Sequence, residues 1–374
     1  MKKLLFAAAA LLCLAQSVSA LNWGGIISNT SKPSTSDLSN IDFYQSNGIS
    51  LWAGSTINSN MRFVMEGLYK YEANIYKDNT SFTNIADLSL LKLSGNWAAG
   101  NGIVAVNAGR FQYSDLSSVV YSQESDGLSF SFQNNSFRIG AYAGYTGLLN
   151  SLNVSMTEKK PEAPKDFYSL CPSYIPLALD FSILNLAGNN ISLQGEYFVS
   201  AEKALKSKFY ADLTVNGSIT PAASYQLTAV LGSEDFKKFM LYAKGGLSFF
   251  LGQNLIASAA CEYASGANGS LLPFKTISTR TVFNGKMYSD TFGSIVPQAS
   301  LVFVRNSLLF SLAEKAVIAM PGEKADFKGL DSSLNFVCNV LSDLQVGSSV
   351  IAYADFKDKA NSNYSLAINV SLSF

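Results

Sequence analysis

The sequence predicts an all-β fold, a transmembrane antiparallel β-barrel of about 18 strands. Three observations predict it. Apolar and polar residues alternate with a period of two along most of the chain after residue 20. The gaps between the alternating segments switch regularly between short and long. The composition is 48% hydrophobic but only 14% charged, against about 25% charged for an average soluble domain. Most polar residues are therefore uncharged, which suits a protein with one surface that does not face water.

The first 20 residues have the pattern of a secretory signal peptide. Lys2 and Lys3 supply a basic start, residues 4–15 form an apolar run, and residues 18–20 place small side chains where a signal peptidase reads them. The apolar run is too short for a membrane-spanning helix, which needs about 20 residues. We therefore expect residues 1–20 to be removed on export.

The remaining chain, residues 21–374, is expected to form a single transmembrane barrel domain. A different interpretation takes Cys13 as a lipoprotein acceptor, but Leu12 is bulky where such sites favour a small residue. Three cysteines follow residue 20, and an odd number cannot all form disulfides. We therefore expect strand pairing, not disulfide bonds, to hold the fold together.

The alternation is clearest at the end of the chain. A period of two places successive side chains on opposite faces of a sheet. Segments near residues 128–133, 137–144, 191–200, 211–219 and 239–249 repeat the pattern. The apolar face of the last segment carries Tyr364, Leu366, Ile368, Val370, Leu372 and Phe374.

A soluble β-sandwich would show the same alternation, with its apolar face turned inward. Strands of such folds average about 5–6 residues. The segments in this chain run to roughly 11–14 residues, which exceeds the roughly 9–11 that a transmembrane strand needs. Strand length therefore favours a barrel, and a barrel of this size is too wide for its own side chains to fill. The polar face is expected to line an aqueous lumen.

Eight short turns and nine longer connections join the 18 expected strands. The turns lie near residues 58–60, 98–101, 134–135, 188–189, 220–221, 251–253, 305–306 and 341–343. The longer connections lie near residues 30–41, 75–84, 116–126, 149–174, 202–208, 234–238, 266–291, 321–324 and 356–362. This arrangement is typical of bacterial outer-membrane barrels, with short periplasmic turns and long extracellular loops. Residues 85–97 and the segment before Pro321 alternate poorly, so a barrel of 16 strands is an alternative.

The absence of histidine restricts the chemistry that the chain can perform. It excludes Ser-His-Asp and Cys-His catalytic pairs and any metal site with a histidine ligand. The 27 basic residues balance the 27 acidic ones, which argues against a nucleic-acid partner bound through a net positive charge. We therefore expect no enzymatic activity, no cofactor, no metal and no nucleic acid.

Residues 364–374, which end in an aromatic side chain, resemble the terminal strand by which outer-membrane barrels of Gram-negative bacteria are recognised for assembly. Together with the export signal and the turn–loop rhythm, the chain after residue 20 resembles the porins and related substrate channels of that membrane. The resemblance covers the architecture and no family-specific motif. It implies that Tyr364, Leu372 and Phe374 belong to an assembly signal for the barrel-assembly machinery, and that the barrel is surrounded by outer-membrane lipids.

Two function classes follow from this resemblance. The first is a porin or substrate channel for passive diffusion of small hydrophilic solutes through a polar lumen. The second is a structural or adhesive barrel at the cell surface, whose loops bind a partner. The chain could function alone or as a homo-oligomer, and the sequence does not identify the solute.

Charged side chains within the strands are the candidate pore lining. In one interpretation a basic wall lies beside an acidic wall, and the field between them orients dipolar solutes. In the other, these residues form salt bridges that brace the wall without touching the solute. The candidates are Arg62, Arg110, Arg138, Lys244, Asp180, Glu196 and Asp212.

Two loops are candidates for a constriction. Residues 149–174 hold three prolines and several charges, and residues 266–291 hold three further basic side chains. Either could fold inward and narrow the pore, or could cover its mouth from outside. Aromatic residues near strand ends fit the girdles of a membrane barrel or, on the inner face, a sugar-stacking path. They are Tyr69, Tyr71, Phe111, Tyr113, Tyr145, Tyr197, Tyr263 and Tyr364.

Overall fold

The computed structural model describes residues 21–36, 40–76, 79–158, 166–267, 271–278, 293–320 and 325–374. The expected signal peptide at residues 1–20 lies outside these residues, as do residues 159–165 and 279–292 of the two candidate constriction loops. Within the described ranges, no helix is long and apolar enough to cross a membrane.

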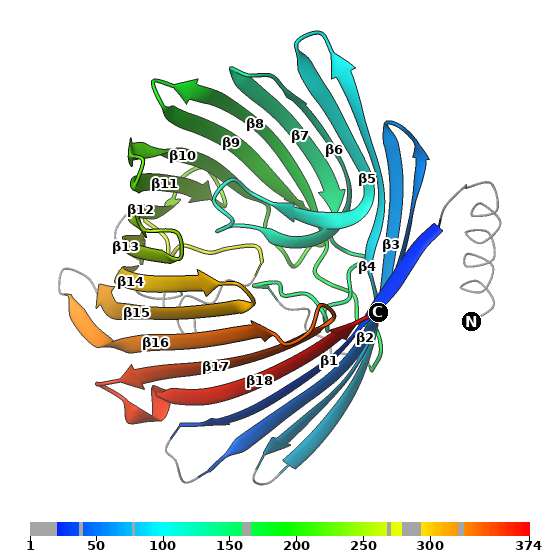
Figure 1. The fold of residues 1–374 in the computed structure, drawn as a ribbon. Helices are drawn as coiled ribbons and strands as arrows, with labels where there is room; N and C mark the ends of the chain where they lie inside the picture. Colours follow the sequence, from blue (N-terminus) through cyan, green and yellow to red (C-terminus); the bar gives the residue numbers. More distant parts are fainter. Residues whose placement is uncertain are drawn as a thin grey trace.

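The strands form one closed antiparallel sheet of 18 members (Figure 1). Each strand pairs with its neighbours along the chain, and β1 also pairs with β18. The predicted all-β barrel and its count of 18 strands are therefore confirmed. The strands are β1 (Leu21–Thr35), β2 (Asp42–Asn58), β3 (Met61–Tyr76), β4 (Asn79–Ala99), β5 (Gly102–Ser114), β6 (Ser122–Gln133), β7 (Phe137–Tyr145), β8 (Tyr174–Leu186), β9 (Asn189–Ser200), β10 (Lys208–Thr220), β11 (Ala223–Ser233), β12 (Phe239–Leu251), β13 (Leu255–Ala264), β14 (Gly293–Arg305), β15 (Leu308–Met320), β16 (Asp326–Asn339), β17 (Leu344–Asp355) and β18 (Asn363–Ser373).

The two faces of the sheet differ as the alternation predicts. On β18, Leu366 is 40% exposed and faces outward, whereas the neighbouring Ser365 is 6% exposed. Leu227 of β11 and Leu193 of β9 are likewise more than half exposed on the outer surface. Large apolar side chains on the outside of a closed barrel are stable only in contact with lipid, because water would oppose their exposure.

The eight predicted turns all lie at the same end of the barrel and join consecutive strands. Their sequences supply the local chemistry that a tight reversal needs. The Asn58 side chain accepts a hydrogen bond from the Asn60 amide (2.9 Å), and the Asn134 side chain accepts one from the Ser136 amide (2.8 Å). Gly100, in the turn between β4 and β5, adopts a positive φ of 58°, which glycine tolerates at little cost.

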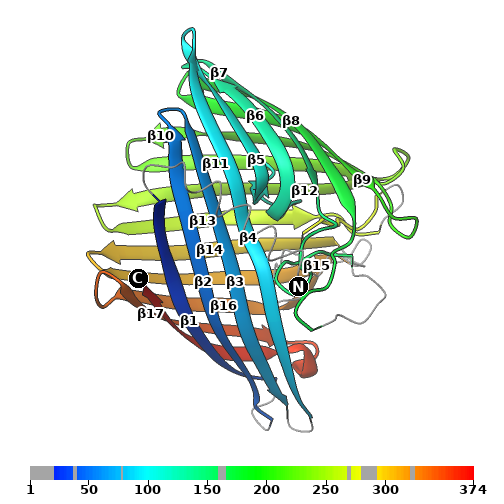
Figure 2. The same ribbon diagram turned by 90° about the vertical axis from the view of Figure 1, so that its right-hand side faces the viewer.

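One predicted long connection is wrong. The chain near residues 75–84 was expected to form a loop, but β3 and β4 continue through it and leave only residues 77–78 between them. The strand ends are polar on both faces here, which hid them from a search for alternation. Figure 2 shows β1–β4 crossing one side of the barrel as long, steeply tilted strands.

A β-bulge explains the poor alternation of residues 85–97. Between β3 and β4, Glu66 faces Leu90 while the next residue, Gly67, faces Leu88, so Ser89 is an extra residue. A bulge moves the following side chains to the other face, which breaks the period of two. A second bulge lies between β15 and β16, but its extra residue, Lys328, belongs to β16, so it does not account for the poor alternation before Pro321. The 16-strand alternative rested on these segments and is therefore wrong.

The aromatic residues divide between the two surfaces. Tyr69, Tyr197 and Tyr364 are exposed on the outer surface, as a girdle requires. Phe111 is instead buried inside the barrel, and Tyr113 stacks on Tyr142 with ring centroids 3.7 Å apart. This inner group braces β5 against β7 and is not part of a girdle.

Candidate functional site: the lumen and the segments that narrow it

The inner face of β9–β15 encloses a hollow of about 780 Å³ near the turns. We call it the polar hollow. Its walls are formed mostly by short uncharged polar side chains, because these are the residues that alternate with the lipid-facing leucines. The lining includes Asn190, Ser192, Thr214, Asn216, Ser224, Tyr225, Gln226, Lys244, Ser248, Ser258, Gln298 and Ser300.

Lys244 is the one charged residue in the lining of the polar hollow within the described residues. Its Nζ atom lies 2.8 Å from Oε1 of Glu262 on the neighbouring strand β13, and the Gln298 amide donates to the same oxygen (3.1 Å). The lysine is therefore neutralised by a partner on the wall, so the polar hollow carries little net charge.

Residues 115–121, between β5 and β6, fold into the barrel. The Asp115 carboxylate accepts hydrogen bonds from the amides of Val119 (3.2 Å) and Tyr121 (2.7 Å), which closes the segment into a compact turn. Figure 1 shows β5 and β6 bending into the ring ahead of this turn. The sequence predicted a long external loop here and did not identify it as a constriction.

Two wall residues hold this turn in place. The Leu116 amide donates to the side chain of Gln194 (2.7 Å), and the Ser117 amide donates to the carboxylate of Asp212 (2.9 Å). Gln194 also donates to the Tyr113 hydroxyl (2.7 Å). The predicted pore residue Asp212 is therefore 1% exposed and anchors an inward segment, with no free face toward a solute.

The described parts of the two candidate constriction loops also fold into the barrel. The Thr157 amide donates to the Ile277 carbonyl (3.0 Å), and the Ile277 amide donates to the Val120 carbonyl (2.9 Å). These bonds join residues 146–158, 271–278 and 115–121 into one internal layer. Where the structure describes the two loops expected near residues 149–174 and 266–291, they therefore fold inward and do not cover the mouth of the barrel from outside.

An apolar cluster fixes this layer to the wall. Burying each leucine-sized or larger side chain contributes roughly 1.5–3 kcal/mol, so the layer is held by packing as well as by hydrogen bonds. The lumen was expected to be polar throughout, and that expectation is wrong on this side, because the inward segments need apolar wall residues to pack against. The cluster includes Val120, Tyr121, Leu149, Phe274 and Ile277 from the segments, and Tyr174, Phe198, Tyr210, Val230 and Met240 from the wall.

Charged contacts tie the layer to the barrel at two further points. Lys208 is 1% exposed, and its Nζ atom lies 2.7 Å from Oε1 of Glu158, whose Oε2 accepts a hydrogen bond from the Tyr174 hydroxyl. Glu234, in the connection after β11, lies 3.2 Å from Lys206 and 3.4 Å from Lys275. Burial raises the pKa of Glu234, but the hydrogen bond from Lys206 and the charge of Lys275 outweigh it and lower the pKa overall.

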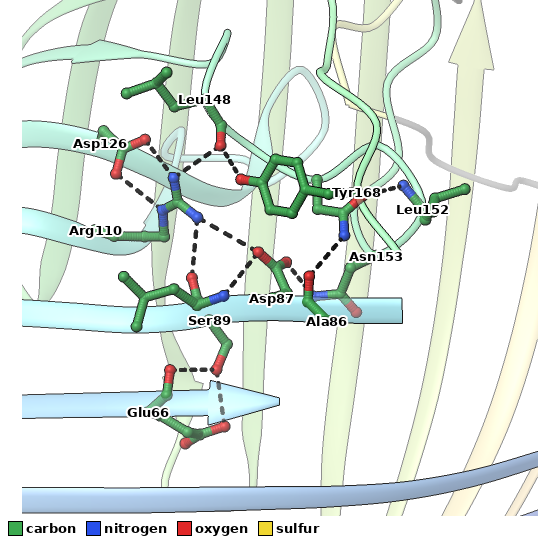
Figure 3. Close-up of polar contacts among 12 residues, drawn as sticks. Glu66, Ala86, Asp87, Ser89, Arg110, Asp126, Leu148, Leu152, Asn153 and Tyr168 are labelled. Carbon is green, nitrogen blue, oxygen red and sulfur yellow. Dashed lines mark hydrogen bonds and ion pairs between the residues drawn. The ribbon is translucent and has the colours of Figure 1, made fainter. Parts of the chain in front are cut away.

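Arg110 lies at the centre of a separate network, drawn in Figure 3. Its guanidinium donates to both carboxylate oxygens of Asp126 (2.9 and 2.8 Å) and to the carbonyls of Leu88 (3.0 Å) and Leu148 (2.9 Å). It also approaches Asp87 at 3.4 Å. A guanidinium with several partners in fixed directions joins elements rigidly. Arg110 therefore connects β4, β5 and β6 to the inward segment after β7.

The position of Arg110 follows from the bend in β5. Arg110 lies on the same face of β5 as Val106 and Ala108. This is the outward face, because their cross-strand partners Phe130 and Leu128 are exposed on the outside of the barrel. Pairing between β4 and β5 stops at Arg110, and the chain around Phe167 bonds to the free edge of β4 instead. Arg110 is 6% exposed and lies between these layers, so it does not line the lumen.

The remaining candidates lie apart from one another. Arg62 is exposed beside the turn after β2, and Arg138 lies 3.8 Å from Asp180 on the adjacent strand. Glu196 is 2% exposed, and neither of its carboxylate oxygens has a hydrogen-bond partner among the described residues. Among the described residues, these side chains therefore do not form the expected basic wall beside an acidic wall. Most of these charges brace the barrel or lie beneath the inward layer.

The fold of the closed barrel is similar to that of several solved structures. Three crystal structures from Pseudomonas aeruginosa cover nearly the whole chain. OccK7 (OpdD) has 10% identity and a TM-score of 0.64, and covers 95% of this chain and 99% of its own. OpdQ has 10% identity and a TM-score of 0.62, covering 96% and 99%. OccK5 (OpdH) has 11% identity and a TM-score of 0.60, covering 96% and 98%.

No protein-family model and no curated protein sequence matches this chain. At about a tenth identical residues, the likeness to the three structures concerns the fold alone. It confirms that the architecture expected from the porin-like pattern is the one that this sequence adopts.

Proposed function

We propose that this chain is an outer-membrane channel for passive diffusion of small hydrophilic solutes, based on the barrel fold that it shares with OccK7, OpdQ and OccK5. The observation that carries the proposal is the pairing of a lipid-facing apolar surface with the polar hollow inside the same closed sheet. A polar interior within an apolar exterior gives water and small solutes a path that the bilayer denies them.

The inward layer supports a channel of restricted width. Residues 115–121, 146–158 and 271–278 occupy the half of the barrel opposite the turns, on the side of β8–β13. A solute entering from that half would pass between this layer and the far wall before it reaches the polar hollow. The inferred function is diffusion of small molecules, without chemistry on them.

The same layer disfavours the adhesive alternative. An adhesive barrel presents its long loops outside, where a partner can contact them. In the described residues, the longest connections bury Leu149, Phe274 and Ile277 inside the barrel instead, although Leu148, Phe167 and Leu170 are about half exposed. The proposal also includes a cleaved signal peptide over residues 1–20, insertion by the barrel-assembly machinery, and contact with outer-membrane lipids.

Purified protein in liposomes tests the proposal. Liposomes loaded with both a small sugar and a large dextran should release the sugar and retain the dextran. Liposomes that contain heat-denatured protein provide the control for leakage. Retention of both solutes by folded protein would show that the barrel is closed to diffusion.

A further inference from the structure

We propose that the solutes favoured by this channel are small uncharged molecules with several hydroxyl groups, in preference to anions or cations of the same size. This inference rests on the proposed function and adds a substrate class to it. It is drawn from two features of the polar hollow: the hydrogen-bonding groups along its wall and the pairing of the charges around it.

The wall of the polar hollow offers both donors and acceptors at short intervals. A serine or threonine hydroxyl supplies one donor and two acceptor positions, and a side-chain amide supplies two of each. Few of the lining side chains form hydrogen bonds with each other. Asn190 donates to Asn216 (3.2 Å), and the Ser248 and Ser258 hydroxyls lie 3.0 Å apart. Gln226 is exposed to the lumen between them.

This pattern suits a polyhydroxylated solute better than a charged one. Each sugar hydroxyl also donates and accepts, so it can exchange hydrogen bonds with water for hydrogen bonds with the wall at little net cost. An ion can also bind to these groups, but its hydration is much stronger than that of a hydroxyl, and a neutral wall offers no opposite charge to compensate for the hydration that is lost.

The charges near the polar hollow are either paired or buried, which limits any preference for one sign. Lys244 is held by Glu262 at 2.8 Å, and Arg138 lies 3.8 Å from Asp180. Asp212 is covered by the inward turn that it anchors. Arg62 lies on β3, outside the lining of the polar hollow. Opposite charges held together produce a weak field at the distance of a passing solute.

The experiment compares three solutes of nearly equal size in the liposome-swelling assay: glucose, gluconate and glucosamine at a pH where the amine is protonated. The wild-type channel should admit glucose several-fold faster than either ion. Equal rates, or a lead for gluconate or glucosamine, would overturn the inference while leaving the channel function intact. Entry of none of the three would overturn the proposed function itself, and the inference with it.

Two variants test whether charge pairing is the cause. Glu262→Gln leaves Lys244 as a free cation and should raise the gluconate rate relative to glucosamine several-fold. The double variant Lys244→Gln with Glu262→Gln restores a neutral wall and should return the preference for glucose. Heat-modifiable gel migration checks that each variant is folded. An unchanged gluconate-to-glucosamine ratio in folded Glu262→Gln protein would contradict the role assigned to the pair.

Discussion

The main chains of Phe374 and Gly25 exchange two hydrogen bonds, 2.9 Å from the Gly25 amide to the Phe374 carbonyl and 3.0 Å in the opposite direction. They join the last residue of the chain to β1 at the seam where the barrel closes. The Phe374 ring covers Gly25 so closely that a Cβ atom there would lie 2.5 Å from it. The terminal aromatic residue therefore has a structural role at the seam, in addition to the role in assembly that we expect for it.

Deleting Phe374, or replacing it with Asp, should reduce the amount of folded barrel in the membrane. The loss removes the final pair of seam hydrogen bonds, and a charge at this apolar edge opposes insertion. Heat-modifiable gel migration of membrane fractions measures the folded protein, with Ser373→Ala as the control. Wild-type levels of the deletion variant would show that neither the seam contact nor an assembly signal depends on this residue.

Neighbouring residues of β11 test the two faces of the sheet. Leu227→Arg places a charge toward lipid near the middle of the strand and should lower the free energy of unfolding by about 2–4 kcal/mol. Gln226→Arg, one residue earlier, places the same side chain in the polar hollow and should change it little. Urea unfolding in lipid vesicles measures both. Equal losses would mean that the assignment of faces is wrong.

The anchor of the inward turn is open to a direct comparison. Asp212→Leu removes the acceptor for the Ser117 amide and should loosen residues 115–121, so that the conductance of the pore rises. Glu196→Gln changes a buried carboxylate that holds no hydrogen bond in the described part of the chain, and should leave both conductance and stability at or above wild type. A rise in conductance with Glu196→Gln and none with Asp212→Leu would reverse the roles we assign.

A pH dependence follows from Glu234. Because the folded state lowers the pKa of this carboxyl, its ionised form stabilises the fold above the unfolded pKa, and that contribution is lost as the pH falls through the folded value. Acidification should therefore release Lys275 and speed hydrogen exchange at the Ile277 amide, after correction for the intrinsic pH effect. Glu234→Gln should show the faster exchange already at neutral pH. Exchange that is independent of both changes would mean that packing alone holds residues 271–278.

The sequence predicts the barrel well because lipid imposes a simple rule on every strand. One face must be apolar, and the chain obeys this from Ile27 of β1 to Leu372 of β18. The eight turns are predicted equally well from the sequence, since residues such as Asn58, Asn134 and Gly100 favour tight turns. The prediction fails where the strands do not alternate between apolar and polar residues. This happens at the bulge beside Ser89 and at the polar ends of β3 and β4.

The interior was harder to predict because its contacts are not local. Gln194 and the Leu116 amide are 78 positions apart, and no periodicity links them. Arg110 was expected in the lumen as a strand residue, but the bend of β5 carries it between two layers. The apolar side chains at Tyr210 and Met240 were a usable signal, since they stand on the polar face of β10 and β12 where a water-filled lumen has no need of them.

If the closed barrel contains a continuous aqueous path, purified protein in a planar lipid bilayer should conduct ions. We expect single-channel recordings of wild-type protein to show discrete, uniform steps of current. The steps should be larger in Asp212→Leu protein, where the inward turn has lost an anchor. Folded protein that inserts into the bilayer and carries no current would contradict the existence of this path.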